Sequence, residues 1–173
     1  MGGTVPKQFQ ALRGKPILHY TLRTLQESGL IDSLVLVVPE KECVDARADW
    51  LGRPPVVKRV VVGGEKRQDS VYNGYQSLPS DTDIVLVHDG VRPFLSKEMI
   101  QETIDVAGEF GAAITAIPVH DTLKQVDNSG RVERTVEREG LWRVQTPQAF
   151  RYDLLGEAFL KAKSDSFYGT DEA

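Results

Sequence analysis

The residues best suited to chemistry in this sequence follow a short apolar stretch near its middle. Residues 84–87 read Ile-Val-Leu-Val, and the chain then turns abruptly polar at His88, Asp89, Gly90 and Arg92. An acid, a glycine and a cation at the carboxyl end of a buried strand suit a phosphate-bearing ligand with a divalent metal. The same residues could equally form a polar turn that binds nothing, and this stretch alone does not decide.

A glycine pair marks a second candidate, between a predicted strand over 56–62 and a predicted helix that follows Ser70. Gly63 and Gly64 let the backbone approach a ligand closely, beside the exposed amide groups of a helix start. A glycine pair is weak evidence by itself. It gains weight beside a strand that ends near Asp89, because ligands bind outside the carboxyl ends of the strands in such sheets.

Further polar side chains accumulate at predicted strand ends and in a polar stretch over 121–139. Arginines and hydroxyls suit phosphate recognition, because a guanidinium grips two oxygens at once and hydroxyls donate to the others. Such an arginine could instead form a surface ion pair worth under ~1 kcal/mol, and periodicity does not choose between these interpretations. The candidates are Asp89, Arg92, Thr122, Arg138, Thr146 and Thr170.

Missing signatures and composition exclude several other functions. The sequence has no Gly-x-Ser-x-Gly motif and no Gly-x-x-x-x-Gly-Lys-Ser/Thr phosphate loop. It contains one cysteine, Cys43, so neither an internal disulfide nor a cysteine-based metal site can form. A net charge of −4 argues against a nucleic-acid partner, and the apolar runs are too short to cross a membrane. Residues 6–8 interrupt any hydrophobic start, so we expect no signal peptide and a cytoplasmic location.

Alternating predicted strands and helices must position these residues. The alternation predicts a single domain over residues 1–173: a three-layer α/β sandwich with a mostly parallel, Rossmann-like sheet. Residues 146–148 are expected to turn out of that sheet, and Ser96 is expected to cap a helix. Strands are predicted over 34–38, 56–62, 83–87, 112–119 and 141–145, and helices over 17–25, 41–51, 71–78, 96–110 and 154–163.

The polar stretch interrupts this regularity. Residues 127–130 read Asp-Asn-Ser-Gly, a turn signal between residues 122–126 and 131–136. Both flanks carry too few apolar side chains for core strands. We predict a projecting β-hairpin arm over about 119–140, which would be either a mobile flap or a dimerisation arm.

Seven motifs occur along the chain in one order. They are Pro6-Lys7-Gln8-Phe9, Gly14-Lys15-Pro16-Ile17-Leu18, Gly63-Gly64 with Arg67 and Ser70-Val71, His88-Asp89 with Arg92-Pro93-Phe94, Asp121-Thr122-Leu123-Lys124, Gln145-Thr146-Pro147-Gln148 and Thr170-Asp171-Glu172-Ala173. Over nearly the whole chain they resemble the 2-C-methyl-D-erythritol 4-phosphate cytidylyltransferase family of the non-mevalonate isoprenoid pathway.

This resemblance implies a nucleotidyl transfer that uses Mg²⁺. CTP and methylerythritol 4-phosphate would give the CDP-alditol and pyrophosphate. The attacking phosphate oxygen is already ionised at neutral pH, so no general base is required. The need is to bring two anions together and to stabilise charge in the transition state.

The resemblance also implies roles for individual positions. The catalytic residues would be Lys7, Arg138 and Asp89, with Lys7 stabilising the transferring phosphate and Asp89 on the ribose and metal side. Glu65 departs from the acid most often found at its position, and Gly90 with Val91 replaces an alanine pair. The nucleotide would be bound by Gly64, Glu65, Ser70, Asp89 and Gly90, the first three at the cytosine edge.

The polyol phosphate would be held by Arg92, Thr122, Arg138, Thr146 and Thr170. In the family the hairpin arm reaches into a second subunit, so the resemblance implies a homodimer in which part of this set comes from the neighbour. The family also has a strand and a glycine-rich loop before the position of Met1, and a lysine and a closing helix after Ala173. We therefore expect this sequence to be the ordered remainder of a longer polypeptide, or to be unable to turn over CTP alone.

Two rival functions stay open at this point. Ribitol 5-phosphate cytidylyltransferases share the His-Asp, Arg-Pro-Phe and Gln-Thr-Pro-Gln motifs, although residues 121–124 and 170–172 favour the methylerythritol phosphate enzymes. A non-catalytic nucleotide-binding protein of the same fold should have lost its charged site residues first. Lys7, Asp89 and Arg92 are all present here.

Overall fold

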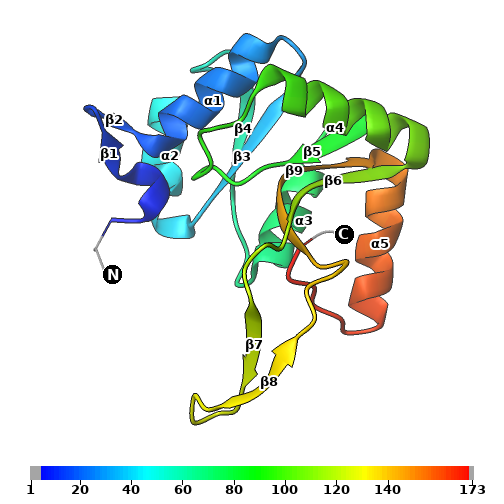
Figure 1. The fold of residues 1–173 in the computed structure, drawn as a ribbon. Coiled ribbons are helices and arrows are strands. Elements are labelled where there is room, and N and C mark those ends of the chain that lie inside the picture. The colour runs from blue at the N-terminus through cyan, green and yellow to red at the C-terminus, as the bar shows by residue number, and fades with distance from the viewer. Residues whose placement is uncertain (1–4, 172–173) are drawn as a thin grey trace.

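The computed structural model describes residues 5–171 of the chain. It is an α/β structure in which helices pack against strands, and one antiparallel strand pair extends away from the rest (Figure 1). The helical segments are η1 (Lys7–Phe9), α1 (Ile17–Ser28), η2 (Glu40–Glu42), α2 (Cys43–Trp50), α3 (Arg67–Gln76), α4 (Lys97–Phe110) and α5 (Tyr152–Ser164). The strands are β1 (Ala11–Leu12), β2 (Lys15–Pro16), β3 (Leu34–Val38), β4 (Val57–Val62), β5 (Ile84–Val87), β6 (Ala112–Pro118), β7 (Leu123–Val126), β8 (Val132–Val136) and β9 (Trp142–Arg151).

The strand pairing corrects the prediction of a mostly parallel sheet. Among the described residues, β3 with β4 is the one parallel pair, whereas β9 runs antiparallel to both β5 and β6. The reason is the path of the chain: it leaves β6, passes through β7 and β8, and returns in the opposite direction along β9. Within residues 5–171 no strand pairing joins β3 to β5.

β9 is also longer than the sequence indicated. Residues 146–148 do not turn out of the sheet, because β9 continues through them to Arg151. A register shift between Ile114 and Ala116 of β6 absorbs the extra β9 residues around Pro147, and the Thr115 hydroxyl donates to the Pro147 carbonyl at 3.0 Å. Proline is tolerated in a strand at such an irregularity.

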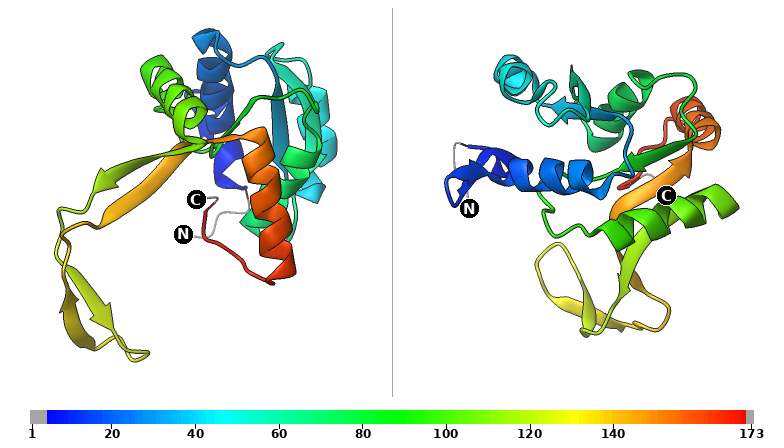
Figure 2. Two further views of the ribbon diagram at one scale, coloured as in Figure 1. Left: turned by 90° about the vertical axis from the view of Figure 1, so that its right-hand side faces the viewer. Right: turned by 90° about the horizontal axis from the view of Figure 1, so that it is seen from above.

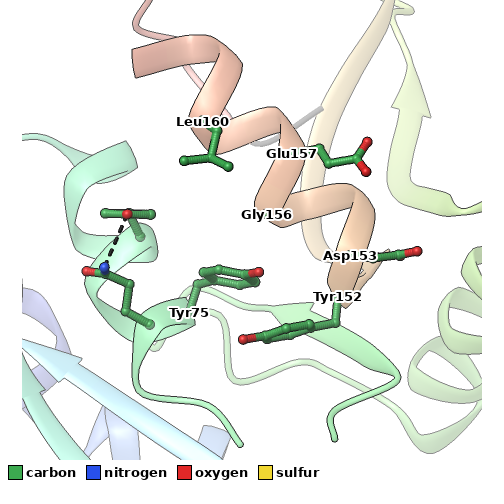
Figure 3. Close-up of a pocket in the computed structure, with 8 residues that line it drawn as sticks. Tyr75, Tyr152, Asp153, Gly156, Glu157 and Leu160 are labelled. Atoms are coloured by element: carbon green, nitrogen blue, oxygen red, sulfur yellow. Dashed lines mark hydrogen bonds between the residues drawn. The ribbon is translucent and has the colours of Figure 1, made fainter. Parts of the chain in front are cut away.

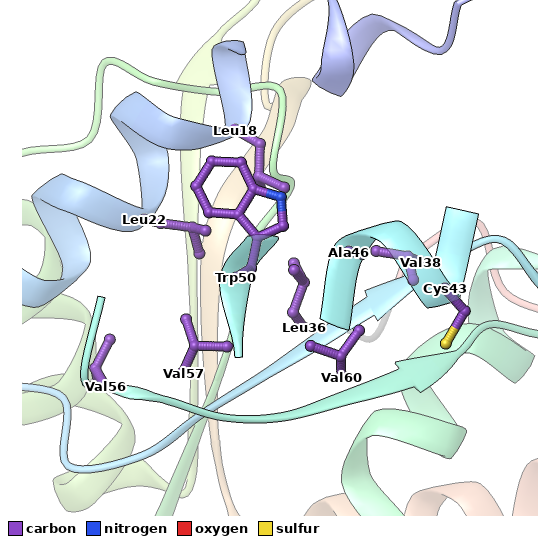
Figure 4. Packing of buried hydrophobic residues seen from close by; sticks show 10 residues of the cluster. All are labelled: Leu18, Leu22, Leu36, Val38, Cys43, Ala46, Trp50, Val56, Val57 and Val60. Carbon is purple, nitrogen blue, oxygen red and sulfur yellow. The ribbon is translucent and has the colours of Figure 1, made fainter. Parts of the chain in front are cut away.

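Helices pack on both faces of β5. Alternate side chains of a strand point to opposite faces. Leu86 accordingly packs with residues of α1 and α4, whereas Val85 packs with residues of α3 and α5. In Figure 2 the ribbons of α1 and α4 lie on one side of β5, and those of α3 and α5 on the other. A separate apolar cluster joins Leu22 of α1 and Trp50 of α2 to β3 and β4 (Figure 4). These contacts fix the carboxyl ends of β4 and β5 with respect to the helices that follow them.

Local sequence signals set several element ends. The predicted cap of α4 is confirmed: Ser96 Oγ accepts from the Met99 amide at 3.2 Å. At the tip of the β7–β8 pair, Asp127 Oδ1 accepts from the amides of Ser129 and Arg131 at 2.8 and 2.9 Å. No helix within the described residues is long and apolar enough to span a membrane.

Candidate functional site

The candidate site begins where β5 ends, at the half-buried carboxylate of Asp89. Arg92 Nε donates to Oδ2 at 2.8 Å, and Arg67 Nη2 lies 3.5 Å from Oδ1. Arg92 belongs to the turn after β5, and Arg67 is the first residue of α3. We call these three residues the carboxylate–arginine group. It joins the end of β5 to the start of α3 and presents two guanidinium groups, which suit the oxygens of a phosphate.

The turn that carries Asp89 is closed by several hydrogen bonds. The Arg92 amide donates to the Asp89 carbonyl at 3.0 Å, and the Thr21 hydroxyl of α1 donates to the Gly90 carbonyl at 3.0 Å. His88 Nε2 lies 3.0 Å from the Arg92 carbonyl, so this nitrogen carries the proton. Burial lowers the pKa of His88 below its ordinary value, and the imidazole is therefore neutral at pH 7.

Two side chains of β9 also contact the Asp89–Arg92 turn. Thr146 is buried, and its hydroxyl accepts from the Asp89 amide at 3.2 Å. Gln145 Oε1 accepts from Arg92 Nη1. The structure thus brings together three of the predicted site residues, Asp89, Arg92 and Thr146.

The glycine loop after β4 packs tightly against the first turn of α3. The Gly64 amide donates to Ser70 Oγ at 3.0 Å, and the Lys66 amide donates to Asp69 Oδ2 at 3.1 Å. A Cβ added to Gly64 would lie 2.3 Å from the Cβ of Asp69, which leaves no room for a side chain. The hydroxyl of Ser70, predicted to bind nucleotide, is therefore engaged within the loop, whereas Gly64 and Glu65 are exposed.

The end of the described chain lies against the same helix start. The Gly169 amide donates to Gln68 Oε1 at 2.8 Å, which places the exposed Thr170 beside the first turn of α3. The structure therefore places Thr170, like Arg92 and Thr146 a predicted substrate-binding residue, near Arg67 and the glycine loop.

Three predicted site residues lie elsewhere. Lys7 is exposed in η1. Its carbonyl accepts from the Gln10 amide at 3.1 Å, whereas its side chain has no hydrogen bond or ion pair to any described residue. Thr122 and Arg138 are exposed beside the β7–β8 pair, where Arg138 Nη1 donates to the His120 carbonyl. Within residues 5–171, none of these three side chains contacts the carboxylate–arginine group.

Residues not predicted for the site also contribute. Arg67 could have been identified as the first residue of a helix that follows a glycine pair, and Gln145 as the neighbour of a candidate threonine. Thr21 lies in the middle of an apolar helix face, and no local signal indicates that its hydroxyl reaches a turn 69 residues away.

The fit of a metal ion depends on the ligand that brings it. No group of three or more potential metal-binding side chains occurs among the described residues, and both oxygens of Asp89 face arginines. Mg²⁺ is often held by one or two carboxylates together with phosphate oxygens and water. Asp89 therefore fits as one ligand of a metal ion that arrives with phosphates, and does not form a site without them.

A cavity of about 410 Å³ lies between α3 and α5, and no predicted site residue lines it (Figure 3). The rings of Tyr75 and Tyr152 stack there with centroids 4.6 Å apart. Burial, and to a smaller extent a hydrogen bond to Tyr152, raises the pKa of Tyr75 to about 12. A Cβ on Gly156 would lie 2.2 Å from Tyr75 Oη. α3 and α5 therefore approach each other closely at Gly156, where no larger residue fits without a shift.

Comparisons with known proteins agree on one family. The family model described as 2-C-methyl-D-erythritol 4-phosphate cytidylyltransferase (IspD) matches residues 1–173. The proteins of that name from Syntrophus aciditrophicus and Pelotomaculum thermopropionicum are 42% and 44% identical over 176 and 175 residues. These alignments cover 100% of this chain and 75% and 74% of the relatives, respectively.

Solved structures give the same result. The structure of 4-diphosphocytidyl-2C-methyl-D-erythritol synthase from Anaerococcus prevotii matches with a TM-score of 0.84 and 33% identity, covering 95% of this chain and 75% of that one. The structure of 2-C-methyl-D-erythritol 4-phosphate cytidylyltransferase from Thermus thermophilus matches with a TM-score of 0.80 and 29% identity, covering 96% and 76%.

Proposed function

Because the chain belongs to the 2-C-methyl-D-erythritol 4-phosphate cytidylyltransferase family, a family of nucleotidyltransferases, we propose that it transfers CMP from CTP to 2-C-methyl-D-erythritol 4-phosphate. The observation that carries the proposal is the carboxylate–arginine group beside the glycine loop. It offers two cations and one carboxylate at the carboxyl ends of β4 and β5, where a nucleoside triphosphate and a second phosphate can meet.

The reaction needs little covalent chemistry from the protein. An oxygen of the acceptor phosphate attacks the α-phosphorus of CTP, and the bond from that phosphorus to the oxygen bridging to the β-phosphate breaks. Pyrophosphate leaves with the bond electrons. The attacking oxygen is already ionised at neutral pH, so catalysis rests on positioning two anions and on stabilising negative charge in the transition state.

The nucleotide lies, in this proposal, between the glycine loop and the end of β5. Backbone groups of Gly64 and Glu65 read the cytosine edge, with Ser70 holding the loop that presents them. Asp89 and Gly90 face the ribose. The hydrogen bond from the Gly64 amide to Ser70 Oγ supports these roles, because it fixes the glycine loop before the nucleotide binds.

Asp89 would be the protein ligand of a Mg²⁺ ion that arrives with the triphosphate. When bound, the ion would neutralise part of the phosphate charge. Arg92 and Arg67 flank the same carboxylate and hold it in place through their donors.

The polyol phosphate is held by Arg92, Thr146 and Thr170, together with Thr122 and Arg138 of the hairpin. Since the last two do not contact Asp89 within the described chain, we infer that they act in the site of a second copy. The β7–β8 pair would then be a dimerisation arm, and Arg138 would serve the neighbour's catalytic centre. Lys7 would approach the α-phosphate from η1.

We also propose a three-layer arrangement and a cytoplasmic location. A three-layer sandwich is supported by the helices on both faces of β5. A cytoplasmic enzyme is consistent with its soluble phosphate substrates.

Pyrophosphate release tests the proposal. Full-length protein is incubated with Mg²⁺, CTP and either 2-C-methyl-D-erythritol 4-phosphate or ribitol 5-phosphate. We expect the first polyol to be used far better, and CTP to be preferred over UTP and ATP. Equal efficiency with both polyols would refute the substrate assignment, and absence of release with every pair would refute the reaction.

A further inference from the structure

The side chain of Gln68, the second residue of α3, binds a segment about a hundred residues away. Its Nε2 donates to the Phe167 carbonyl at 3.2 Å, and its Oε1 accepts from the Gly169 amide at 2.8 Å. One carboxamide thus satisfies an acceptor and a donor of the same backbone stretch.

The Gln68 amide supplies the donor and the acceptor that these two bonds need. A carboxylate of the same shape accepts but does not donate, and an apolar side chain does neither. A neighbouring contact reinforces the attachment: Lys66 Nζ lies 3.3 Å from the ring centroid of Tyr168. We call residues 167–169 the strap. Its attachment to α3 determines where the next residue, Thr170, lies.

The position of Gln68 links the strap to both halves of the candidate site. Arg67 precedes it and contacts Asp89, while Asp69 and Ser70 follow it and hold the glycine loop. A shift of the strap therefore moves Thr170 relative to both, although the strap itself contacts neither Gly64 nor Asp89 in the described structure.

We propose that Gln68 is a positioning residue that determines specificity for the acceptor phosphate. By holding the strap, it presents the Thr170 hydroxyl to the polyol phosphate, while the nucleotide contacts of the glycine loop remain unchanged. This inference rests on the proposed function, because it assigns Gln68 to one of the two substrates of that reaction.

The first test compares the steady-state kinetics of Gln68→Glu with those of Gln76→Glu in full-length protein. Both changes replace an amide by an isosteric carboxylate on α3. Gln76 is exposed, and among the described residues its side chain donates a hydrogen bond only to Tyr72 Oη. Glu at position 68 places a carboxylate oxygen against the Phe167 carbonyl. We expect KM for the polyol phosphate to rise roughly tenfold, the change that loss of one hydrogen bond produces. KM for CTP should stay within about twofold of the wild-type value. In the control variant Gln76→Glu, the KM values for both substrates should also stay within about twofold.

The second test measures the strap without reference to activity. Hydrogen–deuterium exchange of the Gly169 amide and tryptic cleavage after Lys163 should both accelerate in Gln68→Ala and stay unchanged in Gln76→Ala. Unchanged exchange in Gln68→Ala would refute the attachment. A loosened strap with an unaltered KM for the polyol phosphate, or an equal rise in KM for CTP, would refute the specificity role. If wild-type protein releases no pyrophosphate with any acceptor, the proposed function fails and the specificity role fails with it, while exchange still reports on the attachment.

Discussion

His88 Nε2 donates to the Arg92 carbonyl at 3.0 Å, and this hydrogen bond closes the turn that holds Asp89 and Arg92 together. Because a carbonyl only accepts, the proton must lie on Nε2, and Nδ1 then carries a lone pair. That nitrogen is buried and has no partner among residues 5–171. One specific nitrogen of one neutral side chain therefore adds to the bonds from the Arg92 amide and the Thr21 hydroxyl that hold the Asp89–Arg92 turn.

The first prediction follows from this geometry. A glutamine amide can occupy the place of Nε2, whereas an asparagine amide reaches only the place of Nδ1. His88→Gln should therefore keep most of the activity, and His88→Asn should lower kcat/KM by about 5- to 150-fold, equivalent to about 1–3 kcal/mol for a lost buried hydrogen bond. Equal losses in both variants would show that ring packing, rather than the donor, is what matters.

The two arginines of the carboxylate–arginine group should contribute unequally. Arg92 approaches Asp89 at 2.8 Å and Arg67 at 3.5 Å, with all three side chains about a third exposed. Double-mutant cycles pair Asp89→Asn with Arg92→Met or with Arg67→Met, and urea unfolding measures the coupling. We expect about 1 kcal/mol for Arg92 and less for Arg67, since solvent screens both pairs. A larger coupling for Arg67 would contradict this order.

A composite site in a homodimer predicts complementation between inactive subunits. Asp89→Asn and Arg138→Ala should each abolish most of the activity as homodimers. Mixed and allowed to exchange subunits, they should recover part of it, because some heterodimers contain one intact site. Analytical ultracentrifugation tests for the proposed dimer, and a mass-tagged subunit tests for exchange. Persistent inactivity after proven exchange would count against the shared site.

The contact between Gly156 and Tyr75 predicts a stability change far from the chemistry. Gly156→Ala should lower the free energy of unfolding by about 1–3 kcal/mol, because the new methyl group displaces the Tyr75 hydroxyl. Removing that hydroxyl in Tyr75→Phe should restore part of the loss in the double variant. Gly108→Ala on α4, where a Cβ meets nothing within 4 Å, is the matched control and should not destabilise the protein. Additive losses in the double variant would refute the clash.

Local signals predicted the local parts of the structure. Asp89 and Arg92 are predictable together because only two residues separate them within one turn, and the Ser96 cap and the Asp127 turn depend only on neighbours in sequence. The course of β9 through Pro147 was not predictable, since it depends on a register shift in the partner strand β6. The same applies to Thr21, whose contribution exists only after α1 packs over the Gly90 turn.

The position of β9 between β5 and β6 also constrains the order of folding. The Asp89–Arg92 pair spans three residues, so it can form early and locally, whereas the bond from the Asp89 amide to Thr146 closes a loop of 57 residues. Closing such a loop costs entropy before any contact compensates for it, and contacts of this range slow folding. During synthesis the bond between the Asp89 amide and Thr146 can therefore form only after β9 has left the ribosome. Until then β5 lacks its one strand neighbour among the described residues, and unpaired strand edges favour aggregation.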